Sequence, residues 1–432
     1  MPLQQKYVSE KDLEKNRFLG ILEGATARTI FNLTSGAFLV GLLKAMGASD
    51  AVCGYILAIP VLAAVIQFLS PIILESLPYR KRIILIGSSL HRFLLSALIL
   101  IPFLPLDRDV KLWLTGIIFF FSYVGVSFVT PAISNLYVSF VPQNMRGKYF
   151  GNRESYILLT ATAVTLILGK ILDSYTEADK ELVGYIIVYG VIFVLALINF
   201  TSYMKIKEVP LLHSKERLRI VEIFTLPFKD KVFINYFIMS ILWNIATQIG
   251  GAFFGVYLKS DLGLNYTTIT ILSMINSLFY VLSARAWGKY ADKKGWTHTT
   301  KLTIGILAIC HGLWFLAAKG SPILLVLLAV THMIGGTAWS GINVALFNMQ
   351  FDFTPDEKRT VYLGFNAASS GIIGYLAAIV GSQLVNRYGK ESIILLGTAF
   401  DIKQILFLIS SILLTLCAVY ISIFMRPRKK TH

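Results

Sequence analysis

Long apolar runs, separated by short polar and basic segments, dominate the pattern along this 432-residue chain. The runs are apolar on every face, which favours helices over the strands of a membrane barrel, where apolar and polar residues alternate. A helix needs roughly 20 apolar residues to cross a bilayer, and about twelve runs have that length. The pattern therefore predicts an all-α polytopic membrane protein. The predicted spans are residues 18–46, 51–75, 82–104, 111–140, 152–173, 182–205, 231–259, 266–286, 299–318, 322–352, 359–386 and 404–426.

Composition supports this prediction independently. Hydrophobic residues make up 55% of the chain, charged residues make up 15%, and the mean hydropathy is +0.67. A chain of this composition has too little polar surface to cover itself in water. The composition excludes a water-soluble domain, and a lipid bilayer is the expected partner of most of the surface.

The formal net charge of +16 is a topology signal. Of the 40 Lys and Arg, about 28 fall in the two termini and the even-numbered connections, the asymmetry that marks the cytoplasmic side. Both termini are therefore expected in the cytoplasm, and the excess charge is expected to contact anionic lipid. This distribution gives no reason to expect a nucleic acid as a partner.

Two connecting loops are related in sequence. Pro142, Arg146, Tyr149 and Gly151 are followed 213 residues later by the same four residue types, beginning at Pro355. Each copy lies between an apolar run that ends before the proline and another that begins after the glycine. The spacing is close to half the chain, so it predicts two related sets of six helices with pseudo-two-fold symmetry.

A second loop sharpens this prediction, because residues 288–295 read Gly-Lys-Tyr-Ala-Asp-Lys-Lys-Gly. This segment is similar to the Gly-x-x-x-Asp-Arg/Lys-x-Gly loop of the major facilitator superfamily, and with twelve spans in two halves the whole chain resembles that family. The first half departs from the motif, with Glu75 as the only acidic residue near its basic cluster. A glycine turn that brings a carboxylate close to basic residues can hold one conformation and break in another. The residues expected at such gating contacts are Glu75, Arg80, Arg146, Asp292, Lys293 and Arg359.

The predicted division of the chain follows from the same symmetry. Residues 1–204 form an N-terminal six-helix bundle and residues 231–432 form a C-terminal one. Residues 205–230 are basic and amphipathic, which is typical of a short helix in the cytoplasmic interface. A tether between the bundles is the simpler interpretation of that linker, with a regulatory or partner-binding role as the alternative.

Candidate solute contacts lie in the spans that line the central cavity in the family that the chain resembles, namely the first, fourth, seventh and tenth. Each of these spans carries polar residues at helical spacing. Polar side chains inside a membrane are costly and normally face a cavity or another helix. The residues expected to contact the solute are Arg28, Asn32, Asn135, Asn244, Gln248, His332, Trp339 and Asn343.

Arg28 is the candidate with the most specific physical argument for solute binding. It lies about ten residues into its span, hence roughly 15 Å deep, near the bilayer midplane. Its permanent charge needs a partner, either a carboxylate of the protein or an anionic group of the solute. Glu23 lies about 140° round the same helix, so it is poorly placed for that pairing. A contact with a neighbouring helix stays open as the alternative to solute binding.

Glu23 is the candidate for proton coupling. A carboxylate that is partly removed from water binds a proton more readily than one on the surface. The alternative is a fixed ion pair near the cytoplasmic face. His91, Arg92 and His311 lie in spans expected to be peripheral or supporting, and bonding between helices is the role expected of them.

These observations favour a secondary active transporter of a small polar or anionic solute, coupled to protons and working by alternating access as a monomer in the plasma (inner) membrane. Proton-driven efflux of amphipathic drugs or metabolites is the alternative, although the fifth span lacks the Gly-Pro signature of drug antiporters. A membrane sensor and an intramembrane enzyme are more distant alternatives. The sequence contains no phosphate-binding loop, no His-Glu-x-x-His and no metal-ligand cluster, so neither a cofactor nor enzymatic activity is expected.

Overall fold

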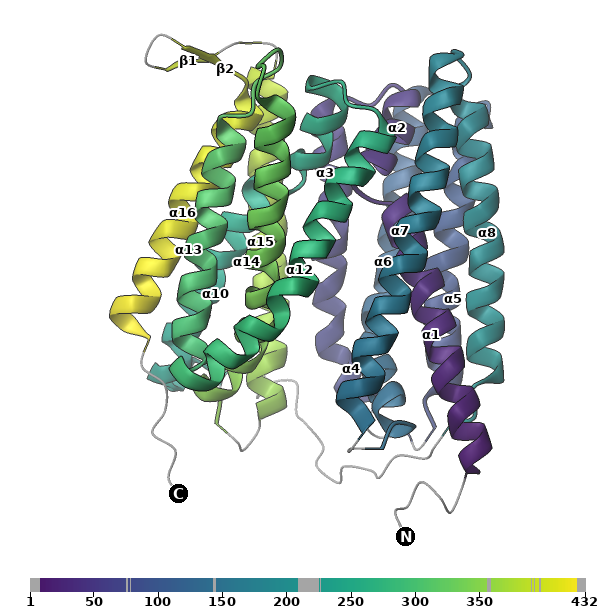
Figure 1. Ribbon diagram of the computed structural model, residues 1–432, viewed down its shortest axis with the longest axis vertical. Coiled ribbons are helices and arrows are strands. Elements are labelled where there is room, and N and C mark those ends of the chain that lie inside the picture. Colours follow the sequence, from purple (N-terminus) through teal and green to yellow (C-terminus); the bar gives the residue numbers. More distant parts are fainter. Residues whose placement is uncertain are drawn as a thin grey trace. The chain divides into compact units, whose positions relative to one another are not determined.

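The computed structural model describes residues 8–74, 77, 79–142, 145–208, 225, 227–355, 359–389, 391, 393–395 and 398–425, and long helices account for most of them (Figure 1). The chain divides into two compact units. The first comprises Met1–Ala48 and Ala63–Leu218, and the second comprises Ser49–Leu62 and Arg219–His432. Nearly all of the helix Asp50–Ala63 thus groups with the second unit. The bundle boundaries predicted from the sequence stay a prediction.

The first unit is built on long helices, which alternate with shorter helices and 3₁₀ segments. Ser9 caps the first helix by accepting a hydrogen bond from the backbone N–H of Asp12, and Gly36, at a φ of 52°, lies where the chain turns into the next helix. The elements are α1 (Glu10–Leu33), α2 (Gly36–Ala45), η2 (Ala64–Phe68), α4 (Leu69–Leu74), α5 (Lys81–Ala97), η3 (Leu98–Phe103), α6 (Arg108–Ser139), α7 (Arg146–Glu177) and α8 (Glu181–Lys205).

The second unit adds α3 (Asp50–Ala63) to the helices of the second half. Asp230 and Asn265 cap two of these helices through their side chains, and Gly295, at a φ of 83°, separates two others. The remaining elements are η5 (Pro227–Lys229), α10 (Lys231–Gly251), α11 (Phe253–Val256), the π-turn η6 (Tyr257–Asp261), α12 (Tyr266–Lys294), α13 (Trp296–Phe315), α14 (Leu324–Phe353), α15 (Arg359–Tyr388), β1 (Ile393–Leu395), β2 (Thr398–Phe400) and α16 (Ile402–Phe424).

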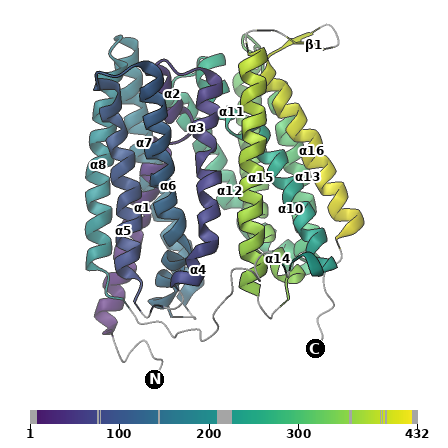
Figure 2. The same ribbon diagram turned by 180° about the vertical axis from the view of Figure 1, so that it is seen from behind.

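The two units repeat one packing pattern. In the first, α1 packs on α7 and α8, and α5 packs on α6 and α8. In the second, α10 packs on α15 and α16, and α13 packs on α14 and α16, as can be followed in Figure 2. The tyrosines of the two related loops have matching positions, because Tyr149 donates a hydrogen bond to Arg17 O on α1 (2.8 Å) and Tyr362 packs against Phe233 on α10. Tyr149 and Tyr362, near the starts of α7 and α15, therefore anchor these helices on α1 and α10, which hold equivalent places in the two units.

Two details differ from the sequence prediction. Ten helices of the described residues are long and apolar enough to cross a membrane, so the predicted count of twelve is not confirmed. The two predicted spans that fall short are represented by α1 and α13, which carry charged and polar residues along their length. In addition, β1 and β2 form an antiparallel hairpin, with Ile393 opposite Phe400, in the connection before α16.

Candidate functional site

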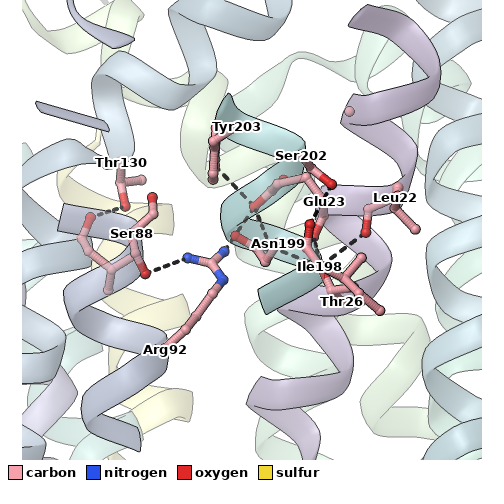
Figure 3. A network of polar contacts seen from close by, with 12 residues as sticks. Leu22, Glu23, Thr26, Ser88, Arg92, Thr130, Ile198, Asn199, Ser202 and Tyr203 are labelled. Carbon is pink, nitrogen blue, oxygen red and sulfur yellow. Dashed lines mark hydrogen bonds and ion pairs between the residues drawn. The ribbon is translucent and has the colours of Figure 1, made fainter. Parts of the chain in front are cut away.

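The most polar part of the first unit surrounds Glu23 on α1. This residue is only 4% exposed. Asn199 and Tyr203, one helical turn apart on α8, donate to its carboxylate, with distances to Oε1 of 3.4 Å and 3.0 Å. Tyr137 on α6 donates to the other carboxylate oxygen. Figure 3 shows Asn199 and Tyr203 converging on Glu23 from α8.

Arg92 on α5 is the first ion-pair partner of Glu23. Its Nη2 lies 2.8 Å from Oε1 of the carboxylate, and both side chains are 5% exposed. Nη1 of Arg92 donates to Ser88 O at 3.0 Å, while its Nε has no hydrogen-bond partner among the described residues. A charge so far from water needs this pairing, because the interior does not solvate it.

Arg153 on α7 is the second partner and is held more loosely. Its Nη2 lies 3.5 Å from the other oxygen of Glu23, and its side chain is 16% exposed. The guanidinium also donates through Nε to Gly20 O (3.1 Å) and lies over the ring of Tyr137, 4.5 Å from its centroid. A Cβ at Gly24 would lie 2.6 Å from Nη2 of Arg153, so the glycine makes room for this approach.

The electrostatic balance of this polar cluster is uneven. One carboxylate faces two guanidinium groups, which leaves one net positive charge inside the helix bundle. Arg92 is fully enclosed, whereas Arg153 is the more exposed and lies further from Glu23. The arrangement can therefore hold a second anion at Arg153 while Glu23 stays paired with Arg92.

The predicted solute residues of the first unit lie outside this cluster. Arg28 is exposed and makes no hydrogen bond or ion pair with any residue that the structure describes. Asn32 lies close to Thr165 on α7, with 3.5 Å between Nδ2 and Oγ1, and Asn135 is exposed on α6. Arg28 and Glu23 do not pair, as their angular separation on α1 predicts.

The predicted solute residues of the second unit fall into small local groups. Trp339 packs edge-on against Trp243, with ring centroids 5.6 Å apart, and Asn343 donates to the hydroxyl of Tyr280 at 3.2 Å. His332 lies 2.7 Å from Leu328 O through Nδ1. The remaining pair lies one turn apart on α10, where Asn244 donates to Ser240 O and both Asn244 and Gln248 approach Gly374.

The predicted gating residues have mixed outcomes. Arg146 donates to Val141 O (3.2 Å) and Val138 O (3.4 Å), so it caps the end of α6 in its own unit. Arg80 is buried and donates through Nε to Leu77 O. Asp292 and Lys293 are exposed at the end of α12. Glu75, the side chain of Arg359 and most of the predicted linker helix lie outside the described residues.

The second unit has its own charged cluster, which the sequence did not reveal. Lys403 on α16 is 1% exposed, and its Nζ lies 2.7 Å from Asp261, 2.9 Å from Asp50 and 3.5 Å from Asp401. These residues come from the ends of η6, α3 and α16, and the side chains of the three aspartates are 23–27% exposed. No group of His, Cys, Asp and Glu suited to hold a metal ion occurs in the described part of the chain.

Comparisons with known proteins identify the class. Ionisable residues buried inside membrane helices are rare and mark solute or ion pathways. The sequence model of the Major Facilitator Superfamily matches residues 24–374 of the chain. The chain therefore belongs to this superfamily of transporters. An uncharacterised MFS-type transporter of Methanocaldococcus jannaschii is 25% identical over 287 residues, which cover 63% of this chain and 70% of the relative.

Solved structures of similar fold agree with this assignment. A mutant form of the nucleoside transporter NupG superposes with a TM-score of 0.69 at 17% identity, covering 96% of this chain and 99% of that one. A D-xylose-proton symporter superposes with a TM-score of 0.66 at 14% identity, covering 98% of both chains. At these identities the likeness shows the fold alone, an integral multi-pass membrane architecture.

Proposed function

We propose that this chain is a secondary active carrier that moves a small polar solute with an anionic group, together with protons, by alternating access. One observation carries the proposal, namely a carboxylate 4% exposed in a membrane helix with two arginines as partners. Buried ionisable residues of membrane helices are costly and mark solute and proton pathways. Membership of the superfamily supports a transporter, and the polar cluster supports the finer assignment.

The proposed coupling rests on competition for one guanidinium. An ionised Glu23 neutralises part of the charge of Arg92 and Arg153, whose guanidiniums lie 2.8 Å and 3.5 Å from its two carboxylate oxygens. A proton that binds a carboxylate oxygen of Glu23 removes its negative charge and frees Arg153 for the anionic group of the solute. Loss of the proton restores the ion pair and expels the anion. One proton and one monoanion together leave the charge of the cluster unchanged, so their joint movement is electroneutral.

Arg28 has a separate role in this proposal. It lies on α1 with Glu23, is exposed, and is free of ion pairs with the described residues. We assign it, with Asn32 and Asn135 of the same unit and the polar residues of α10 and α14, to the contacts that hold the rest of the solute. Both termini are assigned to the cytoplasmic side of the plasma (inner) membrane, on the distribution of Lys and Arg.

Transport by the purified protein in liposomes tests the proposal. The expected result is accumulation of an organic acid or phosphorylated compound under an inward proton gradient, lost when the gradient is dissipated, with sugars, nucleosides and cationic drugs as comparison solutes. Arg28→Ala should abolish uptake while the protein remains inserted, whereas Arg82→Ala, which removes an arginine near the start of α5, should not. Product formation without accumulation, or normal uptake by Arg28→Ala, would contradict the proposal.

A further inference from the structure

A groove of about 400 Å³ runs along the seam between α13 and α16 of the second unit. Lys301 and Gly305 line it on α13, and Ser411 and Ser422 line it on α16. The eleven-residue separation of the two serines gives it a length of roughly 16 Å, about half of a membrane span. The groove has the size of a small-molecule site and is open along its side.

The walls of this groove are effectively apolar, although three hydroxyl residues lie on them. Ser411 donates to Ala308 O (2.7 Å), Thr415 donates to Ser411 O (2.9 Å), and Ser422 donates to Ala418 O (3.0 Å). Each hydroxyl hydrogen is thus used within the protein. The groove presents mainly CH groups to an occupant, which favours a hydrocarbon chain over a polar solute.

The surface around the groove is the kind that contacts lipid. Ile309, Leu416 and Ile423 flank it and are 60%, 52% and 59% exposed. They lie on two neighbouring helices whose other faces pack inside the unit. An exposed apolar surface of this extent on a membrane helix faces acyl chains, because water would oppose it.

One end of the groove carries a positive charge. Lys301 lies in the second turn of α13, close to Gly295 and at the end that the charge distribution predicts to be cytoplasmic. It makes no hydrogen bond or ion pair with the described residues, and none of the residues lining the groove is acidic. An amine beside a hydrocarbon groove complements a phosphate attached to an acyl chain.

We propose that the groove binds one anionic phospholipid, with an acyl chain along Gly305 and Ser411 and the phosphate at Lys301. A second copy of the chain fits less well, because a two-fold interface on this surface would bring two Lys301 side chains together at the same depth. The corresponding seam of the first unit, between α5 and α8, is filled instead. There Phe93 packs against Phe193 and Phe200, with ring centroids 6.0 Å and 6.2 Å apart.

Gly305→Leu tests the hydrocarbon part of the site. A Cβ at Gly305 meets no atom within 4 Å, so the leucine can occupy the groove without displacing the helices. Gly190→Leu is the matched control, because Gly190 on α8 is equally open. The full chain is reconstituted in vesicles of equal phosphatidylglycerol and phosphatidylcholine, extracted in mild detergent, and examined by native mass spectrometry.

The wild type and Gly190→Leu should retain one phosphatidylglycerol in preference to phosphatidylcholine. The fraction of protein that retains this lipid should be at least ten-fold lower in Gly305→Leu. Lys301→Gln should weaken the preference for the anionic lipid roughly five-fold, since one basic residue near anionic lipid contributes about 1 kcal/mol. Lys231→Gln, at the exposed start of α10, is its control. The proposal would be overturned if the wild type and Gly305→Leu retained lipid equally, or if Lys301→Gln kept the same preference for the anionic lipid. It would also be overturned if the wild type formed a dimer without lipid and Gly305→Leu did not.

Discussion

The interiors of the two units differ in chemistry although their helices pack in the same pattern. The first unit buries an ionic cluster in the middle of its bundle, where Glu23 meets Arg92 and Arg153. Among the described residues of the second unit an aromatic group packs between the helices, with Phe254 stacked on Phe407 at 4.4 Å and Trp314 edge-on to both. Its charged cluster around Lys403 lies at helix ends.

This difference indicates which residues serve stability alone and which serve transport as well. Aromatic packing holds helices together at any degree of protonation, whereas a buried carboxylate between two guanidiniums is costly to keep and costly to break. Charges at helix ends remain near water and need less compensation. We therefore expect changes in the first unit's cluster to affect both stability and transport, and changes in the second unit's aromatic packing or in its Lys403 cluster to affect stability alone.

The largest effect is expected from Arg92→Met. Removing this guanidinium leaves Glu23 with one distant partner, and breaking a buried ion pair costs about 3–5 kcal/mol of unfolding free energy. Arg153→Met should cost only about 1 kcal/mol, because its ion pair is longer and partly hydrated. Thermal unfolding in detergent measures both, and equal losses would show that the two arginines are not distinguished by burial.

Phe407→Ala should destabilise the second unit by about 3 kcal/mol through the loss of a buried ring and the cavity left behind. Phe407 is fully buried against Phe254 and Trp314. Uptake per folded molecule should remain near that of the wild type, because no solute or proton is assigned to this packing. A loss of proton dependence in this variant would remove the proposed separation between the units.

Lys403→Met is expected to cost about 2 kcal/mol, less than the change at Arg92, because the three aspartates that lose their partner are 23–27% exposed whereas Glu23 is 5% exposed. Adding Asp261→Asn should recover part of the loss by relieving repulsion among those carboxylates. The melting temperatures of the single and double variants test this order. A double variant less stable than Lys403→Met would show that Asp261 has another role.

The smallest effect is expected at the surface pair of Lys207 and Asp12, whose Nζ and Oδ2 lie 2.9 Å apart. The hydrogen bonds from Lys207 and Ser9 lower the pKa of the Asp12 carboxyl below its usual value. The ionised Asp12 carboxylate therefore contributes its full stabilisation at pH values above its usual pKa. This contribution is lost as the pH falls through the lowered pKa of the folded protein. Lys207→Met should leave the melting temperature at pH 7 unchanged, and a clear shift would show that the pair does more than a surface contact.

The sequence predicted the family, the helical architecture and the duplication, because hydropathy, charge distribution and repeated loops are local signals. It singled out Glu23 and the angular separation that keeps Arg28 from pairing with it. It expected Arg92 to bond between helices, as it does, but it did not identify Glu23 as the partner of Arg92 and did not single out Arg153. Arg92 is 69 positions away on α5, and its pairing with Glu23 depends on how three helices pack.

Arg153 was missed for a specific reason. The fifth span was predicted to begin at residue 152, which put Arg153 at its very start beside the basic loop, whereas α7 begins at Arg146 and Arg153 lies about two turns inside it. One signal could have found it, because Arg146, Tyr149 and Arg153 follow one another at spacings of three and four residues, on one face of a helix. The cluster around Lys403 had no such signal, since its four members come from three distant segments.

Transport by Glu23→Gln in liposomes tests the central claim most directly. Glutamine mimics the protonated carboxylate, so the account predicts that solute counterflow persists and becomes independent of pH while accumulation driven by a proton gradient is lost. Counterflow also confirms that the variant is folded and inserted. Gradient-driven accumulation at the wild-type level in Glu23→Gln would contradict the assignment of coupling to this carboxylate.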